Sequence, residues 1–335
     1  PATRGEVVMG TVTEVLALIG SDEPVRVVER DEELLLAEPH PSRLPMKLWS
    51  DHEPLKVVHY PQEYAVEAFA APRCVYENDG LRVEWQKMDG RQPFYHRNCD
   101  VDEIGYQIAG ERTLMTELGV VEHRPGEFSR IPRGVGHDNR GRRESHLLFY
   151  APAPVAEEAE AVRTSEAVFP PFPGWEATPA NEAVTQCMGG PGHDIVVFPV
   201  DEQRLLDRVH VEDERMRVLV KATTPGVTWL YGSGSFRLGS VLLPPSDGRQ
   251  YRRTLDADEV QYQVAGRRTL VSQRGVVELG PGDFVRIPLG VAHTSFSTGP
   301  SEHLVVLADR ELLQVAETTR TARPCTPRLP AELRA

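Results

Sequence analysis

Residues 95–137 read YHRNCDVDEIGYQIAGERTLMTELGVVEHRPGEFSRIPRGVGH, and residues 251–293 read YRRTLDADEVQYQVAGRRTLVSQRGVVELGPGDFVRIPLGVAH. The two stretches align without a gap, and 25 of the 43 positions are identical. A repeat of this kind marks a duplicated structural unit, and the offset of 156 residues is far too long for a solenoid. The sequence therefore predicts a tandem duplication of one domain.

Each copy has the pattern of short β-strands. In the second copy, apolar or alternating runs separated by Gly, Pro and Asp occur at 259–265, 268–271, 275–278, 284–288 and 303–307. Short strands at such intervals are typical of a sandwich or a barrel. We therefore expect an all-β fold class.

The repeat also suggests where the domains begin and end. A stretch between the copies starts acidic and Ala-rich and then becomes rich in Pro and aromatic residues, which favours a short helix followed by an extended linker. The expected organisation is an N-terminal barrel with the site at 1–155, the linker at 156–190, a C-terminal barrel at 191–320 and a tail at 321–335.

Composition excludes several classes of protein. The 335 residues carry a net charge of −13, which argues against binding to nucleic acid because few phosphate charges would be neutralised. The four cysteines are far apart and form no CxxC pair, so neither a disulfide framework nor a thiolate zinc site is indicated. No signal-like or membrane-spanning segment is apparent, which predicts no membrane contact and a cytoplasmic location.

The two copies differ where chemistry is expected. Glu103 and His137 recur in the second copy, but His96 is replaced there by Arg252. Two His and one Glu from neighbouring strands make the facial triad used for non-haem Fe(II), although Mn, Ni or Zn accept the same ligands. We expect His96, Glu103 and His137 to hold Fe(II). In the second copy we expect no metal, with the repeated carboxylate, Glu259, paired to Arg252 or Arg253.

Two motifs resemble those of the cupins. The run Gly126-x5-Pro132-x-Gly134-x2-His137 has the form of the second cupin motif and recurs intact from Gly282 to His293. The run from His96 to Gly110 is similar to the first motif, H-x-H-x4-E-x6-G, with Asn98 at the second His. The resemblance implies a bicupin, that is, two double-stranded β-helix (jelly-roll) barrels.

Within the cupins, the run Tyr95-His-Arg-Asn-Cys99 resembles the YHRNC sequence of homogentisate 1,2-dioxygenase. The resemblance implies an Fe(II) ring-cleaving dioxygenase with His96, Glu103 and His137 as ligands. Two substrate-contacting tyrosines of that family correspond to Phe94 and Arg112 here. We therefore expect an aromatic substrate other than homogentisate.

Further residues are candidates for the site. A ring-opening dioxygenase needs an acid or base, for which we considered His123, the Asp138-Asn139 pair and His146, preferring the last. Asn98 stands at a motif ligand position and is expected to act in catalysis beside the metal. Predicted substrate contacts are Phe94, Tyr95, Gln107, Arg133 and Asn139, with Arg133 chosen to recognise a carboxylate.

Three functions remain open at this point. The first is an Fe(II)-dependent dioxygenase that cleaves a hydroxylated aromatic compound, expected to be an acid, using O₂. The second is another metal-dependent cupin enzyme, such as an oxidase, decarboxylase or isomerase. The third is a non-catalytic small-molecule-binding bicupin. The chain is expected to be a monomer or a homodimer.

Overall fold

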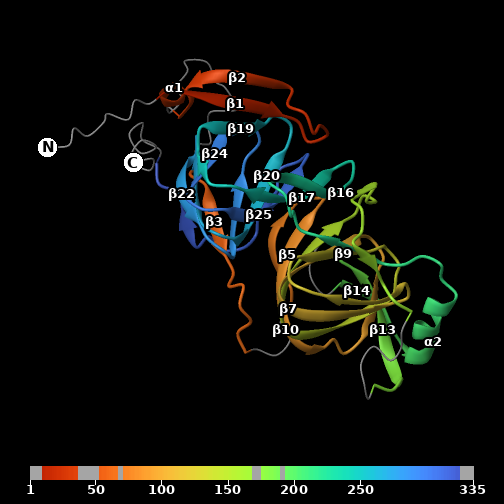
Figure 1. Ribbon diagram of the computed structural model, residues 1–335. Helices are drawn as coiled ribbons and strands as arrows, with labels where there is room; N and C mark the ends of the chain where they lie inside the picture. The colour runs from red at the N-terminus through yellow and green to blue at the C-terminus, as the bar shows by residue number, and fades with distance from the viewer. Residues whose placement is uncertain (1–9, 37–52, 67–70, 168–174, 189–192, 325–335) are drawn as a thin grey trace.

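The computed structural model describes residues 10–36, 53–66, 71–167, 175–188 and 193–324. These residues form two β-barrels packed side by side (Figure 1). The described helices are short: α1 (Glu32–Leu36), α2 (Glu202–Asp207) and the 3₁₀ turn η2 (Arg208–His210). None of them is long and apolar enough to cross a membrane. The all-β prediction is confirmed.

The first barrel is built around two 15-residue strands that pair with each other. These are β7 (Asp102–Thr116) and β10 (His137–Ala151), and both bend at a bulge near Arg143. Their neighbours are β4 (Arg73–Glu77), β5 (Arg82–Arg91), β6 (Tyr95–Asn98), β8 (Gly119–His123) and β9 (Glu127–Ile131). The central order is β9-β7-β10-β5-β4, with β6 on β10 and β8 on β7.

The second barrel repeats this plan with shorter strands. One sheet has the order β16-β17-β25-β20-β23, and the other contains β19-β24-β21-β22, with β18 on β24. The strands are β16 (Gly226–Gly232), β17 (Phe236–Leu243), β18 (Ser246–Asp247), β19 (Gln250–Thr254), β20 (Asp258–Ala265), β21 (Arg268–Ser272), β22 (Gly275–Leu279), β23 (Asp283–Ile287), β24 (His293–Ser297) and β25 (Ser301–Ala308).

The shared glycines Gly110 and Gly266 mark the bend in each barrel. Both have positive φ, at +67° and +72°. A Cβ at Gly110 would lie 2.3 Å from the carbonyl oxygen of Arg143, and one at Gly266 would lie 2.4 Å from that of Pro300. Only glycine fits there without moving backbone, which explains why both copies keep it.

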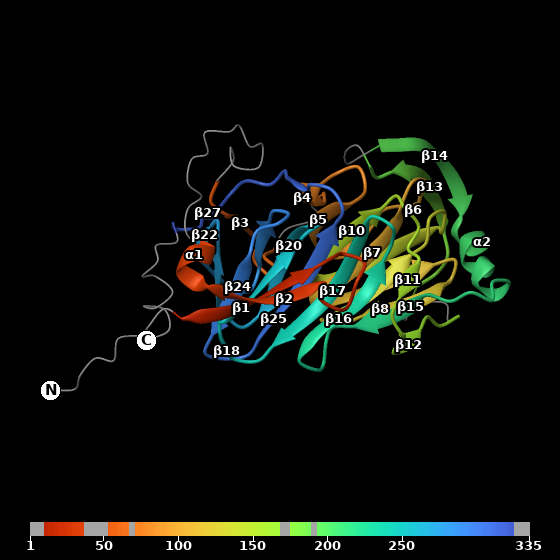
Figure 2. The same cartoon turned by 90° about the horizontal axis from the view of Figure 1, so that it is seen from above.

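The segments that precede the two barrels are exchanged between them. The first segment, β1 (Thr11–Ala17), β2 (Arg26–Asp31), α1 and β3 (Lys56–His59), pairs with the second barrel through β19 and β23. The second segment, β13 (Pro179–Gln186), β14 (His193–Asp201), α2 and β15 (Arg217–Val220), pairs with the first barrel through β6 and β9. Figures 1 and 2 show the red β1 and β2 against the blue barrel and the green β13 and β14 against the yellow one.

This exchange corrects the predicted domain boundaries. The described parts of residues 1–59 pair with the second barrel, and those of residues 179–220 pair with the first. Equivalent contacts hold the two exchanged segments on their barrels. Glu182 accepts from Arg97 and Glu202 from Tyr95, while Glu14 accepts from Arg253 and Glu32 from Tyr251. The duplicated unit therefore includes these segments, and each barrel needs the other repeat to complete its sheet.

Two short strands stand where the sequence predicted a helix at the start of the linker. The expected helix near residues 155–163 is wrong, because β11 (Glu157–Glu158) pairs with β16 and β12 (Arg163–Thr164) pairs with β15. After the second barrel, β26 (Leu313–Gln314) joins β4 and β27 (Arg320–Thr321) joins β3. Sheet edges that need partners override a weak local helical pattern. Residues 168–174 and 325–335, where the aromatic linker segment and most of the tail were expected, lie outside the described residues.

One continuous apolar core joins the barrels. It contains aromatic side chains of the first barrel, such as Tyr76 and Phe128, together with Tyr231, Tyr262 and Phe284 of the second. Tyr76 and Phe284 lie with ring centroids 6.4 Å apart, and so do Tyr60 and Phe284. Because these rings are buried, the two barrels form one packed body rather than two beads on a linker.

Glu14 provides a test of the exchanged segment. Its carboxylate is fully buried, 2.8 Å from Nε of Arg30 and 2.6 Å from Nε of Arg253. Burial opposes ionisation, but the two guanidinium groups outweigh it and hold the pKa of Glu14 below its ordinary value. A carboxyl with a lowered pKa stabilises the fold above its unfolded pKa, about 4.3 for Glu, and this is lost as the pH falls through the folded pKa.

We therefore expect the free energy of unfolding of the wild type to fall more steeply than that of Glu14→Gln as the pH drops from about 6 to about 3. At neutral pH the variant should be about 1–3 kcal/mol less stable, because two guanidinium groups lose a charged acceptor. Urea denaturation at a series of pH values measures both effects. Glu33→Gln, at an exposed position of α1, is the matched control. Parallel profiles for the wild type and Glu14→Gln would contradict the assignment.

Candidate metal site

Three strands bring the predicted triad together in the first barrel. His96 of β6 lies opposite His137 of β10, and Glu103 is on β7, the strand that pairs with β10 on its other side. The two imidazole centroids are 4.0 Å apart, and Nε2 of His137 is 3.5 Å from Oε2 of Glu103. One ligand atom from each of the three residues lies within 4.8 Å of the others. Such a cluster is compact enough to bind a single ion.

The surrounding contacts orient these ligand atoms. Nδ1 of His137 is 2.9 Å from the carbonyl oxygen of Val135, so it donates there and leaves Nε2 as a lone-pair donor. Nε2 is buried and has no hydrogen-bond partner among the described residues. Gln92 contacts Nδ1 of His96, and Nδ2 of Asn98 donates to Glu103 over 2.9 Å. Second-layer contacts of this kind are typical of metal sites, so the residues fit a divalent metal.

The charges of the triad also fit a cation. Burial opposes ionisation of Glu103, but the imidazoles of His137 and His96 and the Asn98 amide outweigh it and lower the pKa of the carboxyl to about 2. Burial, reinforced by His137, lowers the pKa of His96 to about 3. At neutral pH, Glu103 is therefore ionised and His96 is neutral, which are the states that metal ligation requires.

A cavity of about 250 Å³ opens beside the triad. Phe94, Leu148 and Tyr150 give it apolar walls, and burial raises the pKa of the Tyr150 hydroxyl well above its ordinary value, so this group stays neutral. The volume lies just below the roughly 300–1,000 Å³ of typical ligand pockets. Four of the predicted residues outside the triad line it: Phe94, Asn98, Asn139 and His146.

The other three predicted substrate contacts do not line this cavity. Tyr95 points to the opposite face of β6 from His96, and its hydroxyl donates to Glu202 of α2. Gln107 is fully buried, and its amide donates to Glu144 over 3.0 Å. Arg133 is exposed on the loop before β10, and its guanidinium donates to the carbonyl of Pro152. The backbone N–H of Arg133 is bound to Asp102, which fixes this outward direction.

His146 lies between the cavity and a buried polar cluster. Its Nδ1 is 3.6 Å from Oε2 of Glu144, and neither ring nitrogen has a hydrogen-bond partner among the described residues. Burial, followed by the positive charge of Arg112, lowers the pKa of His146. The imidazole is therefore neutral at pH 7 and has a lone pair available. His123, another acid or base candidate, is the last residue of β8 and is buried, with its Nδ1 3.2 Å from the guanidinium of Arg112.

Asp138 has a structural partner instead of a place in the cavity. Its carboxylate accepts from Arg91 over 2.6 Å, and Arg91 also pairs with Glu202 of the exchanged segment. Burial raises the pKa of Asp138 to about 7, although Arg91 opposes the shift. This carboxyl ties β10 to α2.

Several lining residues were not predicted. Gln92 belongs to an Asp-Gly-Arg-Gln run that recurs at residues 247–250. Thr185, Gln186 and Cys187 come from the end of β13, and Sγ of Cys187 donates to Asn98 over 3.2 Å. No local signal could have placed them here, because β13 belongs to the segment that precedes the other barrel.

The second barrel lacks a complete triad. Glu259 is 3.6 Å from Nε2 of His293 and accepts from Gln261 over 2.6 Å. Burial opposes ionisation of Glu259, but His293 and, after it, the charge of Arg252 lower the pKa of this carboxyl. Arg252 lies beyond ion-pair distance from it in the structure. The prediction that Arg253 could pair with Glu259 is wrong, because Nε of Arg253 donates to Glu14.

Comparisons with known proteins give short or distant matches. No family model matches the chain. A protein of Saccharolobus solfataricus that is provisionally named a dioxygenase is 32% identical over 73 residues, 22% of this chain and 19% of the relative. This chain thus matches about a fifth of that relative's length.

The solved structures that match this chain are distant from it in sequence. A cupin 2 conserved barrel domain protein from Leptotrichia buccalis is 9% identical, with a TM-score of 0.47, over 76% of this chain and 97% of that one. An oxalate decarboxylase of Bacillus subtilis is 14% identical, with a TM-score of 0.46, over 80% and 82%. The strand order gives this chain an all-β fold of two barrels, each with one copy of the G-x5-P-x-G-x2-H motif that resembles the second cupin motif, and with a candidate metal centre in the first barrel.

Proposed function

We propose that the protein is a non-haem Fe(II)-dependent dioxygenase that cleaves the ring of a hydroxylated aromatic compound. The observation that carries this proposal is the cluster of His96, Glu103 and His137, which faces a small cavity with an aromatic and aliphatic wall. The YHRNC run at Tyr95–Cys99 and the short match to a provisionally named dioxygenase point the same way.

Two imidazoles and one carboxylate would hold the iron. When bound, Fe(II) would supply the one-electron chemistry that lets O₂ react with an aromatic ring. Asn98 keeps Glu103 in place by its 2.9 Å hydrogen bond, and Val135 fixes the ring of His137. These contacts prepare the ligands before any substrate arrives.

Other residues of the cavity would position the substrate. Phe94 and Leu148 offer flat and aliphatic surfaces to an aromatic ring. Oδ1 of Asn139 is buried and has no hydrogen-bond partner among the described residues, so it can accept from a substrate hydroxyl. Neutral His146 would take the proton of a second hydroxyl as general base.

The cavity disfavours a second negative charge. Its described lining contains Glu84, Glu103 and Asp194 but no Lys or Arg, and Arg133, expected to recognise a carboxylate, lies outside it. Glu84 is already paired with the buried Arg82, so a carboxylate remote from the metal would find no free cation among the described lining residues. We therefore propose an uncharged catechol- or hydroquinone-type ring in preference to the aromatic acid expected from the sequence.

Oxygen uptake tests both statements. With iron-loaded protein, we expect catechol- and hydroquinone-type compounds to be oxidised with a kcat/KM at least tenfold above that of their ring-carboxylated counterparts, because a buried carboxylate would have no Lys or Arg of the described lining to pair with. His96→Ala protein, treated identically, is the control and should consume no oxygen above background. Faster reaction of the acids would contradict the proposed substrate class, and absence of uptake with every compound would overturn the dioxygenase proposal.

A further inference from the structure

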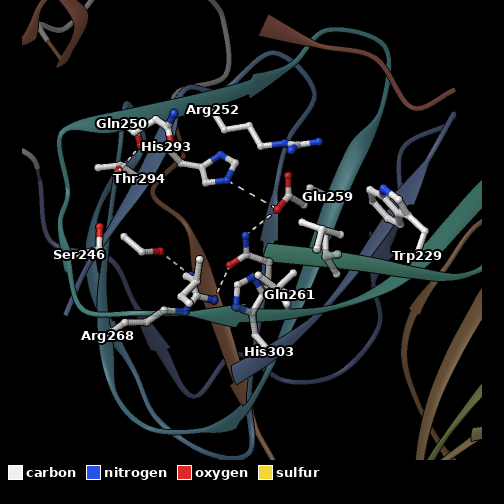
Figure 3. Close-up of a pocket in the computed structure, with 15 residues that line it drawn as sticks. Trp229, Ser246, Gln250, Arg252, Glu259, Gln261, Arg268, His293, Thr294 and His303 are labelled. Atoms are coloured by element: carbon white, nitrogen blue, oxygen red, sulfur yellow. Dashed lines mark hydrogen bonds and ion pairs between the residues drawn. The ribbon is translucent and has the colours of Figure 1, made fainter. Parts of the chain in front are cut away.

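The second barrel keeps a cavity at the position equivalent to the metal site. It has a volume of about 270 Å³, against about 250 Å³ in the first barrel. Arg252 of β19 lies opposite His293 of β24, in the register that joins His96 to His137 in the first barrel. Figure 3 shows Arg252, Glu259 and His293 on one side of this cavity and Arg268 and His303 farther along it. The second barrel therefore has an open space where the first has its triad.

Buried polar atoms line this space without partners. Oε2 of Glu259 and Nδ1 of His303 have no hydrogen-bond partner among the described residues. Unpaired buried polar groups are costly, so such a cavity favours a polar occupant over an empty apolar void. A barrel that served only as scaffold would gain stability by filling the space with larger apolar side chains.

The charge of this cavity is opposite to that of the metal cavity. Its charged lining consists of Arg252, Arg268 and one carboxylate, Glu259. In the first barrel, the equivalent of Arg268 is Arg112, which is 3.8 Å from Glu144. Glu144 stands two residues before His146, and the matching position before His303 is Ser301. The second cavity thus lacks the carboxylate that neutralises its deep arginine.

Arg252 is the cation that is available to a ligand. The guanidinium of Arg268 donates to Gln263, Ser295 and Gln261, so its donors are largely used. Arg252 is partly buried, and its side chain forms no hydrogen bond or ion pair with any residue in the described ranges. A forked donor with a free face is suited to a planar carboxylate, which it can bind with two parallel hydrogen bonds.

The rest of the wall is apolar. Trp229, Val227, Val241, Leu243 and Val305 line the same cavity, and Arg237 packs 4.3 Å from the Trp229 ring on the face of β16. We propose that the second barrel binds a small organic monocarboxylate, with its carboxylate on Arg252 and its apolar body against Trp229. Arg252 thereby uses the register position that His96 has in the first barrel. The proposal concerns a separate cavity and does not depend on the proposed dioxygenase activity.

Isothermal titration with benzoate and with uncharged benzamide tests this site in the full-length, metal-loaded protein. We expect benzoate to bind with a dissociation constant in the millimolar range or tighter and benzamide to bind at least tenfold more weakly. Arg252→Gln should weaken benzoate binding at least tenfold, and Arg252→Lys should weaken it less, because the charge remains. His96→Ala, which alters the other cavity, should leave benzoate binding unchanged.

Each contrary result would overturn the proposal. Absence of benzoate binding by the wild type would do so, as would equal binding of benzoate and benzamide. Loss of binding in His96→Ala, with retention in Arg252→Gln, would assign the carboxylate to the metal cavity instead. The side chain of Arg252 has no hydrogen-bond or ion-pair partner among the described residues, so both Arg252 variants should fold. Unchanged metal content in these variants would show that the first barrel is intact.

Discussion

The His96→Ala variant is expected to lose its metal while keeping its fold. The wild type, purified under anaerobic conditions, should hold near one metal ion per chain, and the variant should fall to less than a tenth of that. The physical reason is that Glu103 and His137 alone offer two ligand atoms, 3.5 Å apart, where three converge now. Removing one of three protein ligands costs far more affinity than altering a supporting contact, which itself costs 10–100-fold.

Metal analysis by emission spectroscopy, with thermal melting as the folding check, measures this effect. The matched control is His293→Ala, because His293 is the counterpart of His137 in the second barrel and also lies beside a buried glutamate. That variant should retain the full metal content. Equal metal in the wild type and His96→Ala, or equal losses in both variants, would place the metal elsewhere and remove the basis for the proposed dioxygenase.

The fold class and the triad could be predicted because both depend on local spacing within the repeat. His96 and Glu103 are seven residues apart, on strands that meet β10 from both sides. Once the barrel register is fixed, side chains alternate between its two faces, so identity at these positions determines what points inward. The same alternation explains why Phe94 and His96 reach the cavity, whereas Tyr95 faces α2.

The exchange of segments could not be predicted from local patterns. The pairing of β13 with β6 joins Glu182 to Tyr95, far apart in the chain, and parallel pairing leaves no hairpin signal. The trace in the sequence is a six-residue likeness, Asp31–Leu36 with Asp201–Leu206, which places Glu32 and Glu202 against equivalent tyrosines. Such a likeness is too short to stand out without the structure.

The predicted role of Arg133 failed because the direction of a loop side chain cannot be derived from its position in the sequence. Arg133 is close in sequence to His137 and absent from the second copy, which made it a reasonable partner for a carboxylate. Its direction depends on the contacts of its own loop, where Asp102 holds the backbone and Pro152 receives the guanidinium. Thr185 and Cys187 were missed for another reason. They reach the cavity from the exchanged segment, in a part of the chain that was assigned to the linker.

A second metal centre should appear when one side chain is changed, in the Arg252→His variant. Glu259 and His293 are already placed as Glu103 and His137 are, with a closest approach of 3.6 Å against 3.5 Å in the first barrel. Nδ1 of His293 faces the carbonyl of Val291 at 3.5 Å, as Nδ1 of His137 faces that of Val135. Position 252 occupies the register of His96. The new imidazole would therefore complete the same three-ligand set.

With excess Fe(II) or Mn(II) under anaerobic conditions, metal content should rise from near one ion per chain in the wild type to near two in Arg252→His. The added ion should bind about 10–100-fold more weakly than the first, because Thr254 replaces Asn98 and cannot support Glu259 in the same way. The double variant with His96→Ala should hold one ion, and Arg252→Ala should hold the wild-type amount. An unchanged stoichiometry in Arg252→His would mean that Arg252 is not what keeps metal out of the second barrel, and that Glu259, held by Gln261 over 2.6 Å, is unable to turn toward an ion.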